Sequence, residues 1–181
     1  IMNRFLDAYG DYMEFCQIQL NYLDWTLQNA KERVEILKKH NIPIWVMEPV
    51  RGGKLANIGE TNEKLLYNAR QEETPVSWAF RFLQTIPEVT VTLSGMSDFK
   101  QVAENIKTFS ESKPLNEYEW QTILQVADNL TNKKTLPCTS CRYCTSYCPQ
   151  ELDIPRLIEL YNDKSFSGKN FIVTTAINNT P

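Results

Sequence analysis

The 181-residue sequence contains a single histidine, no apolar run that approaches the length of a transmembrane helix, and no internal repeat. Residues 1–4 do not begin the apolar segment of a secretory signal peptide. Lysine and arginine are scattered and the formal net charge is −3, so there is no basic cluster of the kind that binds nucleic acid. These absences argue against a membrane or nucleic-acid partner and favour a cytoplasmic protein.

The lone histidine, His40, follows Lys38 and Lys39 at the end of a predicted helix. A cation at the carboxyl end of a helix is stabilised by the helix dipole. The placement therefore favours a structural role for His40 over a catalytic one.

Five cysteines are present, but their distribution is not that of a disulfide framework. Cys16 stands alone in an apolar stretch and is expected to be a small buried hydrophobic residue. The other four lie close together and precede Pro149: Cys138, Cys141, Cys144 and Cys148.

The spacing Cys-x₂-Cys-x₂-Cys-x₃-Cys-Pro is that of bacterial ferredoxins. A short loop with two-residue gaps lets thiolates converge on a cubane from several directions, and its backbone amides donate hydrogen bonds to the sulfur atoms. The pattern predicts a 4Fe-4S cluster. A structural zinc site is the alternative, although zinc modules usually pair two separated Cys-x₂-Cys units. A set of unligated thiols is the remaining reading.

The role of Cys148 has two possible forms. In two-cluster ferredoxins the fourth cysteine of a run binds the other cluster. Cys148 therefore either closes a single cluster or serves a second one, whose other ligands this sequence does not contain.

Residues 14–110 alternate short apolar runs with helical patterns. Strands are expected at 15–20, 42–47 and 89–93. Repeated strand–helix units predict an α/β fold with parallel strands, either a doubly wound sheet or part of a (β/α)₈ barrel. Three parallel strands leave two unpaired edges, so the pattern indicates a portion of a larger sheet. Because the opening residues already have a helical pattern, we expect the chain to be cut from something longer.

Capping residues predict where several helices begin. Asp24 is the expected N-cap of the first helix after a strand, and Thr74 with Pro75 opens a later one. Ser97 is the expected N-cap of the last helix in this region. Its inward positions are expected to be Phe99, Val102, Ala103 and Ile106.

The character of the sequence changes after Pro114. Asn116 and Glu119 have the spacing of a capping box before a helix, and Asp153 and Pro155 open another helix beyond the cysteines. We therefore predict two domains. Residues 1–112 hold the last three β/α units of a (β/α)₈ TIM barrel, and residues 113–181 form a small α-helical, ferredoxin-like iron–sulfur segment.

Three regions, 17–22, 47–55 and 93–97 with 101–105, resemble in order and spacing the second half of an aldo-keto reductase barrel. The cysteine segment resembles the ferredoxin-type extension of one bacterial and archaeal branch of that family. The resemblance implies a (β/α)₈ fold that binds NADP(H) at the carboxyl ends of its strands.

The resemblance also implies roles for individual residues. Gln17 falls at the nicotinamide carboxamide, and Met47 where many members stack an aromatic ring. The loop that starts at Glu48 corresponds to the pyrophosphate side, with Arg51 against a phosphate and close backbone approach at Gly52 and Gly53. The remaining positions divide between the 2′-phosphate loop (Gly95, Met96 and Ser97) and the surroundings of the adenine (Gln101, Glu104 and Asn105).

The family's catalytic Asp, Tyr, Lys and His come from the first half of the barrel, and their motifs are not in this sequence. We therefore expect the C-terminal portion of an NADP(H)-dependent oxidoreductase that cannot reduce carbonyls alone. Expected partners are the N-terminal half of the barrel, an electron-transfer partner and a second copy of the chain. The alternative is an electron-transfer or zinc-stabilised interaction module, with the barrel portion as scaffold only.

Overall fold

The computed structural model describes residues 1–131, Leu136, Cys138 and residues 142–167, with side chains up to residue 162. Two compact units divide the chain, residues 1–128 and residues 129–181. Among the described residues, no helix is both long enough and apolar enough to cross a membrane.

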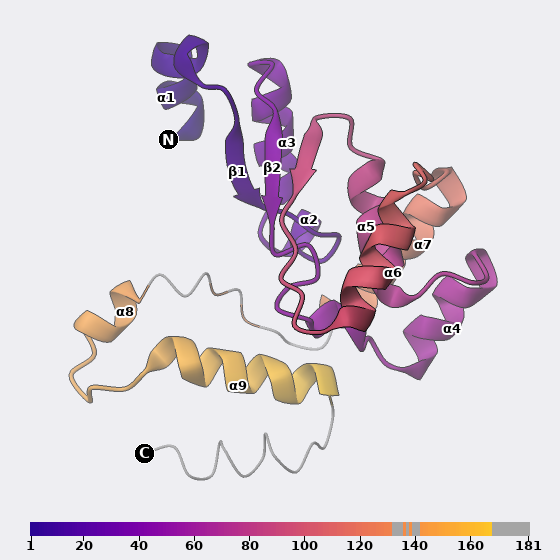
Figure 1. The fold of residues 1–181 in the computed structure, drawn as a ribbon. Helices are drawn as coiled ribbons and strands as arrows, with labels where there is room; N and C mark the ends of the chain where they lie inside the picture. The colour runs from indigo at the N-terminus through magenta and orange to yellow at the C-terminus, as the bar shows by residue number, and fades with distance from the viewer. Residues whose placement is uncertain (132–135, 137, 139–141, 168–181) are drawn as a thin grey trace. The chain divides into compact units, whose positions relative to one another are not determined.

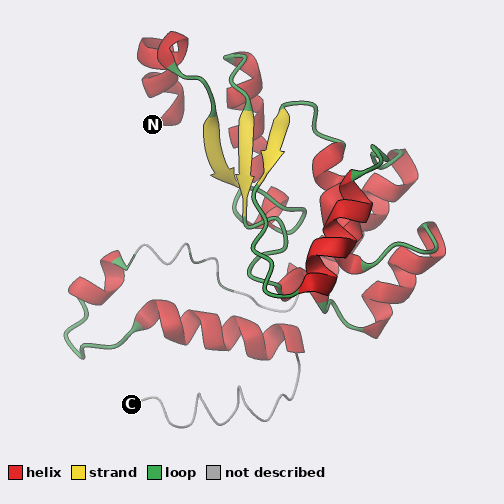
Figure 2. Ribbon diagram, in the orientation of Figure 1, coloured by secondary structure: helices red, strands yellow, loops and turns green. Residues whose placement is uncertain are grey.

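The first unit consists of a small sheet and the helices around it (Figures 1 and 2). Its elements, in order, are α1 (Met2–Tyr9), η1 (Gly10–Tyr12), β1 (Cys16–Gln19), α2 (Asp24–Leu27), α3 (Ala30–Lys39), β2 (Ile44–Met47), η2 (Lys54–Ala56), α4 (Glu60–Ala69), α5 (Pro75–Gln84), β3 (Val89–Thr92), α6 (Phe99–Phe109) and α7 (Glu117–Thr131), which runs a few residues past the division.

The three strands form one parallel sheet in the order β1-β2-β3. Cys16 pairs with Ile44 and Ile18 with Val46 across the first two strands. Ile18, Ile44 and Val46 are buried, which explains why these apolar runs form strands. The prediction of a parallel α/β fold is confirmed, with each strand one or two residues shorter than expected.

The helix expected to begin at Asp24 is two helices, α2 and α3. Asn29 between them has a left-handed backbone, with φ of 52°, and this interrupts the helical hydrogen bonding. The prediction of Asp24 as an N-cap is wrong, because Asp24 lies inside α2 and is fully buried. The apolar stripe of α3, which consists of Ala30, Val34 and Leu37, is buried.

Helix α5 is the centre of the hydrophobic core. Thr74 caps it as predicted, accepting a hydrogen bond from Ser77 N at 3.1 Å, and Pro75 occupies the first turn. Trp78, Phe80 and Phe82 are fully buried, so the helix is covered on most of its circumference.

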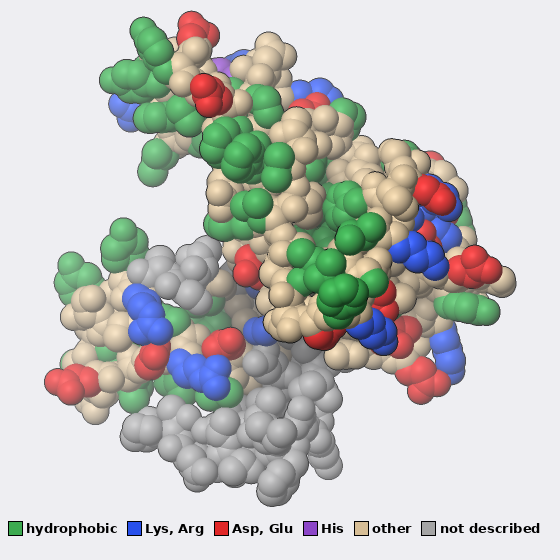
Figure 3. All heavy atoms as spheres, viewed as in Figure 1, with side chains coloured by type: hydrophobic (Ala, Val, Ile, Leu, Met, Phe, Trp, Pro, Cys, Tyr) green, Lys and Arg blue, Asp and Glu red, His purple; other side chains and the backbone are tan. Residues whose placement is uncertain are grey.

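The expectations for α6 are wrong in two respects. Asp98 is its N-cap instead of Ser97, accepting a hydrogen bond from Gln101 N at 2.9 Å. Phe99 and Ile106 do not face inward; they are 89% and 64% exposed. The helix packs on α5 by another side, where Thr108 is buried and donates to Ser77 Oγ at 3.4 Å. An apolar face of α6 is thus uncovered by the described residues, and the space-filling view shows hydrophobic side chains on the surface of this unit (Figure 3).

Helix α7 begins at the predicted capping box. Asn116 Oδ1 accepts from Glu119 N at 3.0 Å, and Glu119 Oε2 accepts from Asn116 N at 2.9 Å. Further along, Trp120 stacks on Phe82 of α5 with ring centroids 4.9 Å apart. The helix that follows Pro114 therefore packs on the core of the first unit.

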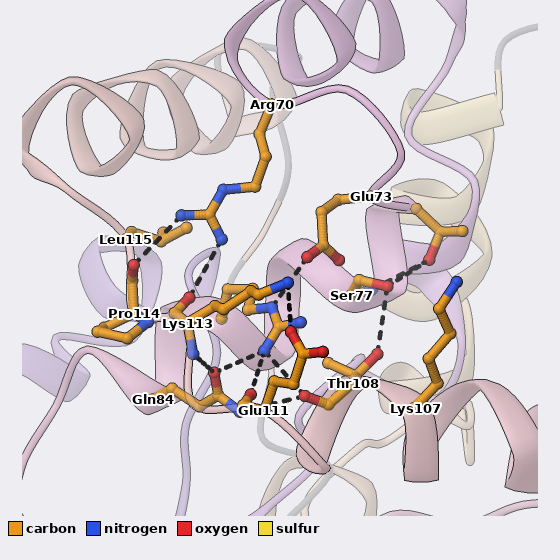
Figure 4. A network of polar contacts seen from close by, with 12 residues as sticks. Arg70, Glu73, Ser77, Gln84, Lys107, Thr108, Glu111, Lys113, Pro114 and Leu115 are labelled. Atoms are coloured by element: carbon orange, nitrogen blue, oxygen red, sulfur yellow. Dashed lines mark hydrogen bonds and ion pairs between the residues drawn. The ribbon is translucent and has the colours of Figure 1, made fainter.

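A polar network fastens the end of α6 to α5 (Figure 4). The guanidinium of Arg81, which is 4% exposed, donates to the carbonyl oxygens of Thr108 at 2.8 Å and Glu111 at 2.7 Å. It also pairs with Glu73 at 3.1 Å. Arg81 thereby satisfies carbonyl groups that a helix end would otherwise leave unpaired.

In the second unit the described elements are α8 (Tyr143–Ser146), which packs against α9 (Ile154–Ser167). Asp153 Oδ1 accepts from Arg156 N at 3.3 Å, which confirms the predicted helix start. Asn162 of α9 holds the backbone of Leu136 by two hydrogen bonds, one of 2.8 Å to its Oδ1 and one of 2.7 Å from its Nδ2.

Candidate functional site

A cavity of about 740 Å³ opens where β2 and β3 end. Its walls come from the loop after β2, the loop after β3 and the side of α6. The last residue of β2 and the loop after it contribute four residues predicted from the sequence, Met47, Glu48, Gly52 and Gly53. The second loop and α6 contribute Gly95, Gln101, Glu104 and Asn105. The carboxyl ends of parallel strands are where α/β folds bind ligands.

The loop after β2 has an unusual backbone. Glu48, Arg51, Gly52 and Gly53 all have positive φ, between 50° and 82°. For Glu48 and Arg51 such a backbone is strained, and strain of this kind persists only where surrounding contacts hold it. A Cβ at Gly53 would meet nothing within 4 Å, so a ligand can approach this backbone closely.

Buried polar residues after β1 hold this loop. The carboxylate of Asp24, which is 0% exposed, accepts from Gln19 Nε2 at 2.7 Å and from Asn21 Nδ2 at 2.8 Å. The same Asn21 amide donates to the carbonyl oxygen of Glu48 at 2.9 Å. The strained start of the loop is therefore tied to a hydrogen-bonded cluster in the core.

Arg51 belongs to that cluster. Its Nε lies 3.3 Å from Asp24 Oδ1, and the side chain is only 12% exposed. Arg51 does not line the cavity. A contact between Arg51 and a bound phosphate stays a prediction, while its pairing with Asp24 is a contact that the sequence reasoning missed.

The second wall of the cavity is organised by the start of α6. Ser97 N donates to Gln101 Oε1 at 2.7 Å, while Gln101 N donates to Asp98 Oδ1. Asn105 Nδ2 donates to Ser94 Oγ at 3.3 Å. These bonds fix the loop after β3 against the first turns of the helix. Met96 and Ser97 themselves do not line the cavity.

Gln17 and Met47, both expected near a nicotinamide ring, lie on neighbouring strands. Gln17 Nε2 is 3.3 Å from Met47 Sδ, and Met47 is 40% exposed. Met47 lines the cavity and Gln17 lies beside it, so the structure brings the two residues together at the strand ends.

The cavity also contains residues that the sequence reasoning did not select, among them Val76, Asp98 and Lys100. The Asp98-x-x-Gln101 spacing is an N-cap signal and could have identified Asp98. His40 lies elsewhere, at the end of α3, with Nε2 3.5 Å from Asp7 Oδ1.

Three of the four clustered cysteines fall within the described residues, and Cys141 lies outside them. Cys144 is exposed in α8 and Cys148 is half-buried. Cys148 N donates to Thr145 O at 3.2 Å, so Thr145 and Cys148 belong to one turn. Within the described part of the chain, no three His, Cys, Asp or Glu side chains are grouped to hold a metal ion.

A parallel sheet with a cavity between glycine-containing loops at the strand ends makes this an α/β protein with a cavity where such folds bind their ligands. The sequence profile of the aldo/keto reductase family matches residues 4–128, and the chain belongs to this family. Oxidoreductases make up the family, which typically uses NADP(H).

Two solved structures of one protein resemble the chain in fold. They are the holo and apo forms of aldo-keto reductase AKR11C1 from Bacillus halodurans. The holo form is 21% identical with a TM-score of 0.52, and the apo form 20% identical with a TM-score of 0.53. Each match covers 68% of this chain, which spans 46% and 47% of the holo and apo chains. A comparison with curated proteins gave no match.

Proposed function

We propose that this chain forms the last three β/α units of an aldo/keto reductase-type (β/α)₈ barrel and contributes part of its nicotinamide-dinucleotide site. The whole protein would move a hydride between the dinucleotide and a carbonyl or alcohol. The observation that carries the proposal is the cavity at the ends of β2 and β3, which gathers eight of the twelve residues expected at such a site.

On this proposal, each wall of the cavity binds a different part of the dinucleotide. Gly52 and Gly53 allow the pyrophosphate to approach the loop backbone, and Gln17 and Met47 lie at the nicotinamide end. Gln101, Glu104 and Asn105 contact the adenosine end. The residues present suit a dinucleotide in shape, because an open glycine backbone stands opposite a polar helix side.

The partner that this proposal requires is the rest of the barrel. Within the described residues, β1 and β3 are edge strands, and α6 exposes Phe99 and Ile106. Unpaired edges and an apolar helix face are surfaces that further β/α units would cover. The barrel's catalytic residues would come from that part, so the chain alone would not reduce carbonyls.

Titrating the purified chain with NADPH or NADH, with tryptophan fluorescence as the readout, tests the dinucleotide site. We expect saturable binding. The variant Gly53→Val should weaken it about tenfold, because the valine side chain fills the space through which the dinucleotide approaches the backbone. Tyr67→Ser on α4, outside the cavity, is the matched control. Absence of saturable binding would leave the barrel portion as scaffold only.

We also propose that Cys138, Cys141, Cys144 and Cys148 bind a 4Fe-4S cluster. The donor set suits it, because four thiols stand at ferredoxin spacing and, of these, Cys144 is exposed and Cys148 half-buried. A bound cluster supplies one-electron transfer to or from an electron-transfer partner. Reduced, metal-binding thiols of this kind are typical of the cytoplasm, where we place the protein.

Anaerobic purification followed by iron, acid-labile sulfide and zinc analysis tests the cluster. We expect about four irons and four sulfides per chain, falling steeply in Cys144→Ser and unchanged in Cys16→Ser, the control cysteine in β1. Zinc without sulfide would instead support the zinc-stabilised interaction module.

A further inference from the structure

The cavity at the ends of β2 and β3 is acidic. Glu48, Asp98 and Glu104 line it, and Lys100 is the one lysine or arginine among its described lining residues. Lys100 Nζ lies 3.8 Å from Glu104 Oε1, so its charge is already offset by a carboxylate. Three carboxylates thus face one ammonium group.

Arg51 is the arginine nearest to this cavity along the chain, but its charge is committed elsewhere. It pairs with Asp24, which is fully buried and has no other basic partner within the described residues. Turning Arg51 toward a ligand would leave a buried carboxylate uncompensated, which is costly. Arg51 is therefore not available to neutralise an anion at the adenosine end.

The amino end of α6 does not offer an anion site either. Its positive dipole end is occupied by the Asp98 carboxylate, which accepts the hydrogen bond from Gln101 N. Gln101 Oε1 in turn accepts from Ser97 N. A phosphate brought to this helix start would meet the negative charge of the Asp98 carboxylate.

We infer that the dinucleotide site, on the proposed function above, takes NAD(H) in preference to NADP(H). The two cofactors differ only at the adenosine ribose, where NADP(H) carries a 2′-phosphate with about two negative charges. NAD(H) has a 2′-hydroxyl there, which can donate a hydrogen bond to a carboxylate. The charges at the adenosine end fit the hydroxyl and do not fit the phosphate.

The test compares the binding of NADH and NADPH to the purified chain by calorimetric titration at low salt. NADH is expected to bind about tenfold more tightly, because unscreened repulsion between carboxylates and the 2′-phosphate raises the dissociation constant of NADPH alone. Added salt screens this repulsion and is expected to bring the ratio of the two dissociation constants closer to one.

The double variant Asp98→Asn/Glu104→Gln assigns the effect to these carboxylates. It is expected to shift the ratio about tenfold toward NADPH, because both side chains keep their shape and lose their charge. Asparagine still caps α6, and the single variant Glu104→Gln leaves the cap untouched and should give part of the shift. Glu60→Gln, exposed on α4 and outside the cavity, is the control.

Each outcome has a distinct meaning. Tighter binding of NADPH than NADH overturns this inference and leaves the proposed dinucleotide site standing. A preference for NADH that the double variant does not alter overturns the role of Asp98 and Glu104. Failure of both cofactors to bind overturns the proposed function and the inference with it.

Discussion

Asp24 has a different role from the one that its sequence context indicates. A short polar residue before a helical pattern is a usual N-cap, yet this carboxylate is fully buried and binds Gln19, Asn21 and Arg51. Two of its partners precede it by a few residues, and Arg51 comes from the loop after the next strand. The contact depends on where β1 and β2 end beside each other.

Replacing Asp24 by asparagine is expected to destabilise the protein and loosen the loop. The Oδ2 atom accepts two amide hydrogen bonds while Oδ1 faces Arg51. Asparagine has one oxygen in place of two and no charge, so its NH₂ group would face either the two amide donors or Arg51. The free energy of unfolding should fall by about 3 kcal/mol in denaturant titrations, and trypsin should cleave faster after Arg51.

Glu35→Gln is the matched control for this variant, because Glu35 forms an exposed pair with Lys31 at 3.9 Å. Its effect should stay within about 0.5 kcal/mol. If Asp24→Asn were as stable as the parent chain, the carboxylate would not be what holds the loop.

Arg81 is a second buried charge, and two of its partners, the carbonyl oxygens of Thr108 and Glu111, lie far along the chain. Arg81→Met is expected to lower the free energy of unfolding by about 2–4 kcal/mol, because Glu73 and two carbonyl oxygens lose their donor. Thermal and chemical denaturation measure this change. Lys64→Met, which breaks only an exposed pair with Glu60, should cost less than about 0.5 kcal/mol, and an equal loss in both variants would contradict the role of Arg81.

At the scale of single elements, the start of α7 is held to the end of α4 by a pair of charged side chains. Glu119 completes the capping box and pairs with Arg70 from the end of α4, with Arg70 Nε donating to Glu119 Oε1 at 2.7 Å. Arg70 also donates to the carbonyl oxygens of Lys113 and Pro114, at 3.1 and 3.2 Å. The segment before α7 is thereby fixed to α4.

This attachment predicts a pH dependence of stability. Burial raises the pKa of Glu119. The hydrogen bonds from Arg70 and Asn116, together with the charge of Arg70, lower it by more than burial raises it, so the pKa lies below its ordinary 4.5. The folded state thus favours the carboxylate. The contribution of the pair is fully present above pH 4.5 and is lost as the pH falls through the lower pKa of the folded state.

Urea titrations at pH values above and below 4.5 test this prediction with Glu119→Gln. The loss of stability caused by the variant should be largest above that pH and should shrink below it. Glu117→Gln, an exposed change in the same turn, should show no such trend. A deficit for Glu119→Gln that does not vary with pH would mean that the charge of Glu119 does not matter.

At the scale of the whole molecule, the first unit leaves apolar surface uncovered within the described residues. Phe99 and Ile106 are exposed on α6, and Leu93 and Met96 are exposed in the loop before it. A helix of an ordinary α/β domain buries its apolar stripe, and on the proposed function this exposed face is where further β/α units would pack.

The double variant Phe99→Ser/Ile106→Ser is expected to separate folding from association. Its free energy of unfolding should stay within about 0.5 kcal/mol of the parent value, because both side chains are exposed. Self-association at high concentration, measured by light scattering, should fall. Tyr67→Ser is an exposed control on α4, and unchanged association in the double variant would mean that this face of α6 is not the contact.

The sequence alone determined the local features of the protein. Apolar periodicity located the strands, and Thr74, Pro75, Asn116 and Glu119 marked helix starts because capping depends on residues three or four positions apart. The resemblance to aldo-keto reductases, carried by the motifs around the strand ends, implied eight of the residues that line the cavity. The cysteine spacing is likewise local, and its cluster stays a prediction.

Only the tertiary structure decided the features that depend on distant partners. Arg51 could pair with a phosphate or with Asp24, and the meeting of two strand ends brings it to Asp24. Periodicity predicted that the apolar positions of α6 face inward, but it does not say which side of a helix the neighbouring elements cover. The acidity of the cavity follows for the same reason, since folding brings Glu48 beside Asp98 and Glu104 from another loop and helix.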